Sequence, residues 1–198
     1  MADAPPGGRA IVNRPKVVLI VEDTADGQAL RHLAEKLRLG IVLDYLPAKG
    51  TGEIKRRGDM LIRQAKDRIE DDNGCVAVLI DRDSQSPEHV KRNRAIRQHC
   101  RRENVPLLLA IEELEAWFIA DAGCATWLGL SRPHNSDTVA DPKDQVRRAY
   151  RKKTGKSYQQ RKARIRLAQH CDGSGPERSP SMKNALDHLE KSPCMANK

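Results

Sequence analysis

The chain of 198 residues has few aromatic side chains, no long apolar run and no regular spacing of cysteines. Phe, Trp and Tyr make up 3% of it, so aliphatic side chains must form most of the core. Because no run of about 18 apolar residues occurs, the sequence predicts no transmembrane helix. The odd cysteine count excludes a simple disulfide framework, and the spacing matches no metal site. Residues 1–15 contain no apolar stretch resembling a signal peptide, and we therefore expect a cytoplasmic protein.

What the chain has in excess is positive charge. Its 36 Lys and Arg outnumber its 27 Asp and Glu, which gives a formal net charge of +9. A surplus of this size favours a polyanionic partner, and we expect DNA or RNA rather than a membrane.

Four short apolar runs alternate with helical patterns and predict an α/β fold. The expected strands are 16–21, 41–46, 75–80 and 105–111. Their unbroken Val, Ile and Leu content is typical of strands that a parallel sheet buries on both faces. Helices are expected at about 26–39, 53–71, 87–102 and 112–122, with Asp26 capping the first of them.

The distribution of charge divides the chain into three parts. Residues 1–15 are expected to form a flexible tail, 16–128 the α/β domain, and 129–198 a basic, mostly helical extension packed on the same domain. Tyr150 and Tyr158 interleave with the basic residues, which favours contact with a phosphate backbone and an unstacked base. The candidate nucleic-acid-binding residues are Arg147, Arg148, Lys152, Lys153, Lys156, Arg161 and Lys162.

Acidic residues follow two of the predicted strands. Glu22 comes directly after the first, and Asp81 and Asp83 lie at the end of the third. Parallel strands end at one edge of a sheet, and residues i and i+2 of an extended segment face the same side. We therefore expect these three acids to converge on Mg²⁺ or Mn²⁺ and to serve as metal ligands and catalytic groups. This expectation requires Glu22 to reach the Asp81–Asp83 pair, with no arginine filling the space between them.

Glu22 and the sequence Asp81-Arg82-Asp83 resemble the acidic motifs of the Toprim domain. That domain is the catalytic module of topoisomerases, bacterial primases and the overcoming-lysogenization-defect nucleases. The resemblance covers residues 16–122 and implies a Rossmann-like, mostly parallel four-stranded sheet flanked by helices. It also implies a metal-dependent nuclease.

A narrower resemblance lies in 109–121, Leu-Ala-Ile-Glu-Glu-Leu-Glu-Ala-Trp-Phe-Ile-Ala-Asp, and in Asp141-Pro142-Lys143. Both are similar to signatures of the domain-of-unknown-function 4276 family, stand-alone Toprim-like proteins often encoded beside ATPases in bacterial defence operons. The resemblance implies an antiviral nuclease that works with an ATPase partner. It also implies that Glu115 binds a second metal and that Lys143 neutralises the scissile phosphate. The loop 22–26 departs from the family because it lacks the Gly that often follows the glutamate.

Two other functions fit parts of the sequence. The run 18–23 matches the opening of two-component receivers, in which Asp81 would be phosphorylated. A receiver, however, needs a Ser or Thr after its fourth strand and a Lys-Pro after its fifth, and neither is found here. The remaining alternative is a non-catalytic module that binds nucleic acid or acts in a toxin–antitoxin pair.

Overall fold

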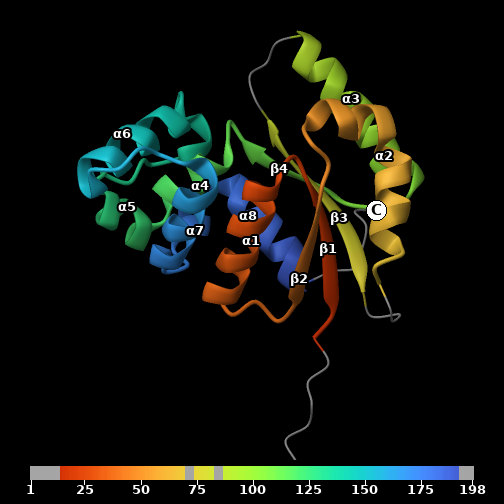
Figure 1. The fold of residues 1–198 in the computed structure, drawn as a ribbon, viewed down its shortest axis with the longest axis horizontal. Helices are drawn as coiled ribbons and strands as arrows, with labels where there is room; N and C mark the ends of the chain where they lie inside the picture. Colours follow the sequence, from red (N-terminus) through yellow and green to blue (C-terminus); the bar gives the residue numbers. More distant parts are fainter. Residues whose placement is uncertain (1–13, 70–73, 83–86, 192–198) are drawn as a thin grey trace, which may run out of the picture.

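The computed structural model describes residues 14–69, 74–82 and 87–191 and has an α/β fold (Figure 1). Its four strands are β1 (Lys16–Val21), β2 (Val42–Pro47), β3 (Cys75–Arg82) and β4 (Leu107–Ile111). All pair in parallel, in the order β2-β1-β3-β4. This confirms the predicted parallel sheet flanked by helices, a Rossmann-like arrangement.

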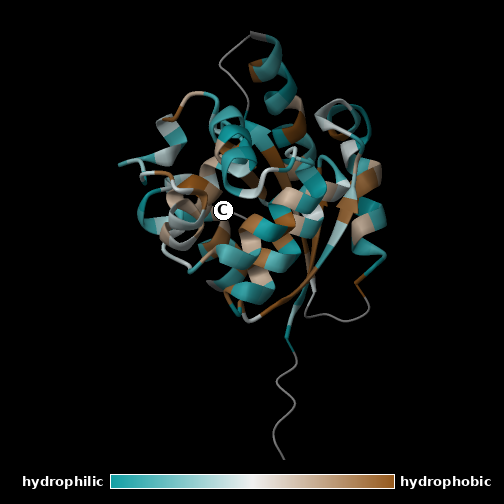
Figure 2. Cartoon of the chain, turned by 60° about the vertical axis from the view of Figure 1, so that its left-hand side comes forward, coloured by the Kyte–Doolittle hydropathy of each residue, from teal (hydrophilic) through white to brown (hydrophobic). Residues whose placement is uncertain are grey.

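Both faces of the sheet are buried, as the apolar strands predict. In β1, Val17, Leu19 and Val21 face one core and Val18 and Ile20 face the other; all five side chains are fully buried. Hydrophobic residues accordingly gather in the strands, whereas the outer helix α3 is largely hydrophilic (Figure 2).

Helices α1 (Thr24–Lys36), α2 (Thr51–Lys66) and α3 (Pro87–Arg102) connect the strands. Helix α1 packs on one face of the sheet, and α2 and α3 pack together on the other. The strand order reverses between β1 and β3, because the chain goes from β1 to β2 on one side and later returns to β3 on the other. Ligands of such sheets bind at the carboxyl end of this switch point, where Glu22 and Asp81 lie.

The C-terminal part belongs to the same core as α1. It consists of α4 (Leu114–Ala120), α5 (Ala122–Leu128), the 3₁₀ turn η1 (Ser136–Thr138), α6 (Pro142–Thr154), α7 (Gln160–His170), the 3₁₀ turn η2 (Gly175–Glu177) and α8 (Pro180–Lys191). Helix α7 lies against α1, and α8 lies against β4 (Figure 1). Trp117 and Phe118 of α4 are 1% and 2% exposed and lie within this core.

The first helix is capped differently from the prediction. Asp23, not Asp26, is the N-cap of α1: its carboxylate accepts hydrogen bonds from the backbone N of Ala25 and Asp26. The Asp26 carboxylate in turn accepts from the backbone N of Asp23. The N-cap therefore lies three residues earlier than expected, and the helix begins with a reciprocal capping box.

No helix in the described part of the chain is long and apolar enough to cross a membrane.

Candidate active site at the carboxyl edge of the sheet

Glu22 and Asp81 meet at the switch point. The backbone N of Asp81 donates a hydrogen bond of 2.9 Å to Oε1 of Glu22, although 59 residues separate them in the chain. Both side chains are partly buried. The structure thus brings together two of the three acids that were expected to converge at this edge. The third, Asp83, lies outside the described residues.

The Asp81 carboxylate lies in a negative environment. Its oxygens have no hydrogen-bond or ion-pair partner among the described residues. Burial, followed by repulsion from Asp26, raises the pKa of Asp81 well above its ordinary value, and Glu22 and Glu115 add to the rise. Arg164 opposes the rise but does not outweigh it. Bringing a cation to this carboxylate would relieve the repulsion.

A buried arginine joins the other acids of this edge. Arg164 of α7 is fully buried and donates from Nε to Oε1 of Glu115 (2.9 Å) and from Nη2 to Oε2 (2.6 Å). Its Nη1 donates to Asp26 of α1. The Tyr158 hydroxyl adds a hydrogen bond of 2.7 Å to Oε1 of Glu115. One guanidinium therefore ties α1, α4 and α7 together beneath the strand ends.

This network decides which of its acids keeps a negative charge. Burial alone would raise the pKa of Glu115, but Arg164 and Tyr158 hold it below its ordinary value. For Asp26 burial prevails over Arg164 and raises the pKa to about 6. Burial also disfavours charge on Arg164, yet Glu115 and Asp26 raise its pKa well above the ordinary value. Arg164 and Glu115 thus form a permanent buried ion pair.

Glu115 consequently has a different role from the one the family resemblance implies. The carboxylate is fully buried, and both of its oxygens accept hydrogen bonds from Arg164. We therefore assign Glu115 to positioning α7 rather than to holding a second metal. Asp26, expected as a helix cap, shares this role.

Lys143, at the start of α6, lies beside this network. Its backbone N and its Nζ contact the Glu113 carboxylate at 3.2 and 3.3 Å. Burial disfavours charge on Lys143, but Glu113 and then Glu115 raise its pKa. The Glu113 pKa is also raised, because burial outweighs the attraction of Lys143. A pocket of about 310 Å³ lies here, lined by Lys143, Arg147, Tyr158 and Gln160 among others. Lys143 therefore keeps a positive charge that faces a cavity.

The seven predicted nucleic-acid-binding residues are all exposed, on α6, α7 and the turn between them. Arg147 and Arg148 pair with Asp144, and Arg161 donates to Gln28. The tyrosines do not lie at the surface as expected for base stacking. Tyr150 is 6% exposed, and Tyr158 packs edge-on against it and bonds Glu115. The basic face therefore offers charges to phosphates and lacks the two predicted stacking platforms.

The donor set fits a magnesium ion that is held partly by its substrate. In the described part of the chain, no group of three or more His, Cys, Asp or Glu side chains is arranged to hold a metal. Mg²⁺, however, typically takes only one or two protein carboxylates, together with water and substrate phosphates. Glu22 and Asp81 satisfy that requirement, because both present oxygen ligands from adjacent strand ends.

Arg164 is the site residue that sequence reasoning missed. It lies in a basic run beside Arg161, Lys162 and Arg166, all of which are exposed. One signal was present: Arg164 precedes Leu167 and Ala168 by three and four residues, which places it on the buried face of α7.

Comparison of the chain with known families, proteins and structures identifies no relative. No protein-family model matches the chain, and neither a curated protein nor a solved structure matches it. The resemblances to the Toprim domain and to its stand-alone relatives therefore stay predictions.

Proposed function

We propose that the protein is a Mg²⁺- or Mn²⁺-dependent phosphodiester hydrolase that acts on DNA or RNA. The observation that carries the proposal is the contact of Glu22 with Asp81 at the switch point of a parallel sheet. Among the described residues no cation forms an ion pair with Asp81, and the nearby Arg164 pairs with Glu115 and Asp26 instead. The net charge of +9 supports an anionic substrate.

Each residue near the edge has a distinct part in this proposal. Glu22 and Asp81 would hold the ion, with Asp83 as the expected further ligand. When bound, the ion supplies charge stabilisation to the attacked phosphate. The Asp81 backbone N fixes the Glu22 carboxylate through their hydrogen bond. Lys143 brings a positive charge to the phosphate from the pocket beside α6.

We favour hydrolysis over phosphorylation of Asp81. The sheet of the described residues has four strands, so no fifth strand end presents the lysine that a receiver requires. We also propose a narrower role, as the effector of a bacterial anti-phage system with an ATPase partner. Its support is the family resemblance alone.

The test is cleavage of labelled single- and double-stranded DNA and RNA by the purified chain with Mg²⁺ or Mn²⁺. We expect Asp81→Asn and Glu22→Gln to lower the rate about 100-fold or more. Asp187→Asn and Glu35→Gln are matched controls on exposed parts of α8 and α1, and they should keep full activity.

Three results would contradict the proposal. One is a folded, metal-bound chain that cuts none of the substrates. Another is cleavage that survives Asp81→Asn. The third is a stable single phosphate on Asp81 after incubation with acetyl phosphate, which would favour the receiver.

A further inference from the structure

A groove on the opposite face of the sheet from Arg164 carries four arginines, none of which is among the predicted nucleic-acid-binding residues. It lies between α3 and the ends of β3 and β4 and has a volume of about 600 Å³. Cavities of about 300 to 1,000 Å³ are typical of ligand sites. The groove is lined by Arg82, Val90, Asn93, Arg94, Arg97, Gln98, Arg101 and Leu109.

The described residues of this groove carry charge of one sign. Among them no acidic residue lines it, and none of its four arginines forms an ion pair. Arg102, one position beyond the last of them, does pair with Asp59 of α2. The groove arginines therefore repel one another, and an anion lying between them would remove that repulsion.

The arrangement of the arginines suits a chain of phosphates. Arg94, Arg97 and Arg101 are spaced three and four residues apart, so they share one face of α3. At about 1.5 Å per residue they span about 10 Å, over which one strand of a duplex carries about three phosphates. Val90, which is 52% exposed, and Leu109 add apolar surface that suits sugar rings. None of the described residues that line the groove is aromatic, so they would not contribute base stacking.

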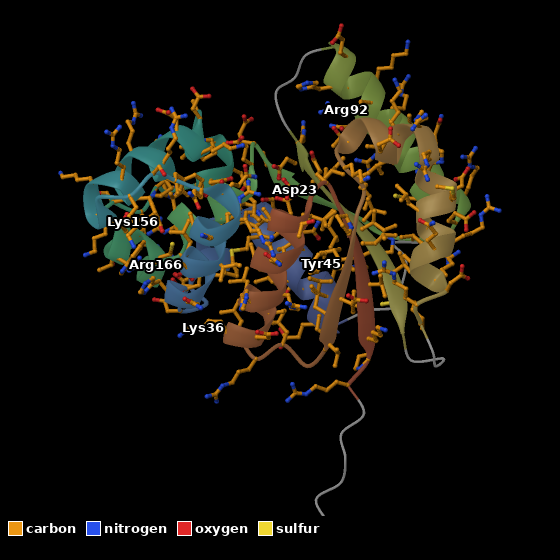
Figure 3. All side chains as sticks on the ribbon, in the orientation of Figure 1. Asp23, Lys36, Tyr45, Arg92, Lys156 and Arg166 are labelled. Atoms are coloured by element: carbon orange, nitrogen blue, oxygen red, sulfur yellow. The ribbon has the colours of Figure 1, made fainter. Side chains whose placement is uncertain are left out.

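The groove and the candidate active site meet at successive residues of β3. Arg82 follows Asp81 directly in β3, and successive residues of a strand face opposite sides. Asp81 continues the row of Ala77 and Leu79 towards α1, whereas Arg82 continues the row of Val78 and Ile80 towards α3. Figure 3 shows Asp23, the neighbour of Glu22, between α3, which carries Arg92, and the basic region where Lys156 lies just after α6 and Arg166 lies on α7.

From these observations we infer that the α3 groove binds the sugar–phosphate backbone of one nucleic-acid strand, independently of sequence. The strand then crosses the carboxyl edge at Glu22 and Asp81 towards the basic face of α6 and α7. This inference rests on the proposed function for its substrate, but binding in the groove requires neither metal nor cleavage.

The experiment measures fluorescence anisotropy of labelled 20-nucleotide single strands, with the full chain in EDTA, at several salt concentrations. For Arg97→Gln/Arg101→Gln we expect about tenfold weaker binding. The slope of log Kd against log salt should fall by about 1.4, from about 0.7 for each lost phosphate contact on a single strand. All sequences should be affected equally.

The control, Lys36→Gln/Arg38→Gln, removes two exposed charges near the end of α1, and it should bind within twofold of wild type. Lys36 lies at the opposite end of the molecule from Arg92 (Figure 3). The charge-preserving Arg97→Lys/Arg101→Lys should retain most of the salt slope, which excludes misfolding as the cause.

Unchanged affinity and salt slope in the Gln variant would overturn the inference, as would a wild-type chain that binds no oligonucleotide. Equal binding of polyglutamate through the same arginines would assign the groove to an acidic protein instead. A chain that binds through the groove but cuts nothing with Mg²⁺ would refute the hydrolase and leave the groove standing. A chain that cuts and binds equally well without Arg97 and Arg101 would refute the groove alone.

Discussion

Glu115 and Asp81 are acids at the same edge of the sheet, and the fold treats them in opposite ways. Glu115 is fully buried, and both of its oxygens accept hydrogen bonds from Arg164. Asp81 has several carboxylates near it and no counter-cation of its own among the described residues. A carboxylate with a dedicated arginine stabilises the fold, whereas one without a partner raises the energy of the metal-free state. The difference separates the structural acids from the candidate metal ligands.

The largest expected effect on stability comes from removing the arginine that pairs with Glu115. Arg164→Met leaves Glu115 buried without its cation, and we expect a loss of about 3 to 5 kcal/mol in the free energy of unfolding. Urea unfolding measures it. Arg161→Gln, an exposed change in the same helix, should cost less than about 0.5 kcal/mol.

A double variant tests whether Arg164 and Glu115 stabilise the fold as a pair. Replacing both partners, in Arg164→Met/Glu115→Leu, should restore part of the loss, because no unpaired charge remains buried. If the double variant is as unstable as the sum of the two single changes, Arg164 and Glu115 do not act as a pair.

A smaller effect of opposite sign is expected from the two acids whose pKa is raised, Asp81 and Asp26. Asp26 has a pKa raised from 3.8 to about 6, and that of Asp81 is also raised. The folded state thus binds these protons more tightly than the unfolded state does. The contribution of these two acids to stability should therefore be greatest below about pH 4 and fall as the pH rises through their raised pKa values. For Asp26 the two-unit shift limits the fall to about 3 kcal/mol.

Asp81→Asn should remove the contribution of Asp81 to the loss of stability at rising pH. Without metal at pH 7, the variant should be more stable than wild type and unfold at a higher temperature, because no carboxylate then remains among the neighbouring acids at this position. At pH 4 the two should unfold at the same temperature, and Asp187→Asn should show no such dependence. A variant that is less stable at pH 7, or equally shifted at pH 4, would show that Asp81 is not under electrostatic strain.

The sequence was sufficient for the sheet and for the meeting of Glu22 with Asp81. The apolar runs identify the four strands, and parallel strands bring their carboxyl ends to one edge. Prediction failed where burial depends on contacts between distant helices. The spacing of Arg164 from Leu167 and Ala168 places it on the buried face of α7. That spacing does not reveal its partners, because the buried acids that pair with Arg164 come from α1 and α4.

The arginine groove also depends on contacts between helices that the sequence of one helix does not reveal, and here these contacts leave residues exposed. The helical pattern of α3 puts Val90, Ile96, Arg97 and Cys100 on one stripe, but only Ile96 and Cys100 of these are buried. Helix α3 packs against α2, and this contact, which the pattern of α3 alone does not contain, leaves Val90 and Arg97 exposed over the groove.

Binding of Mn²⁺, measured by isothermal titration calorimetry at pH 7.5, tests the central claim most directly. We expect wild type to bind, Asp81→Asn and Glu22→Gln to lose binding, and Asp187→Asn and Glu35→Gln to retain it. Tyr158→Phe, which removes a hydrogen bond from Glu115, should leave Mn²⁺ binding unchanged. A wild-type chain that binds no Mn²⁺, or an Asp81→Asn variant that binds it as wild type does, would contradict a metal site at the ends of β1 and β3.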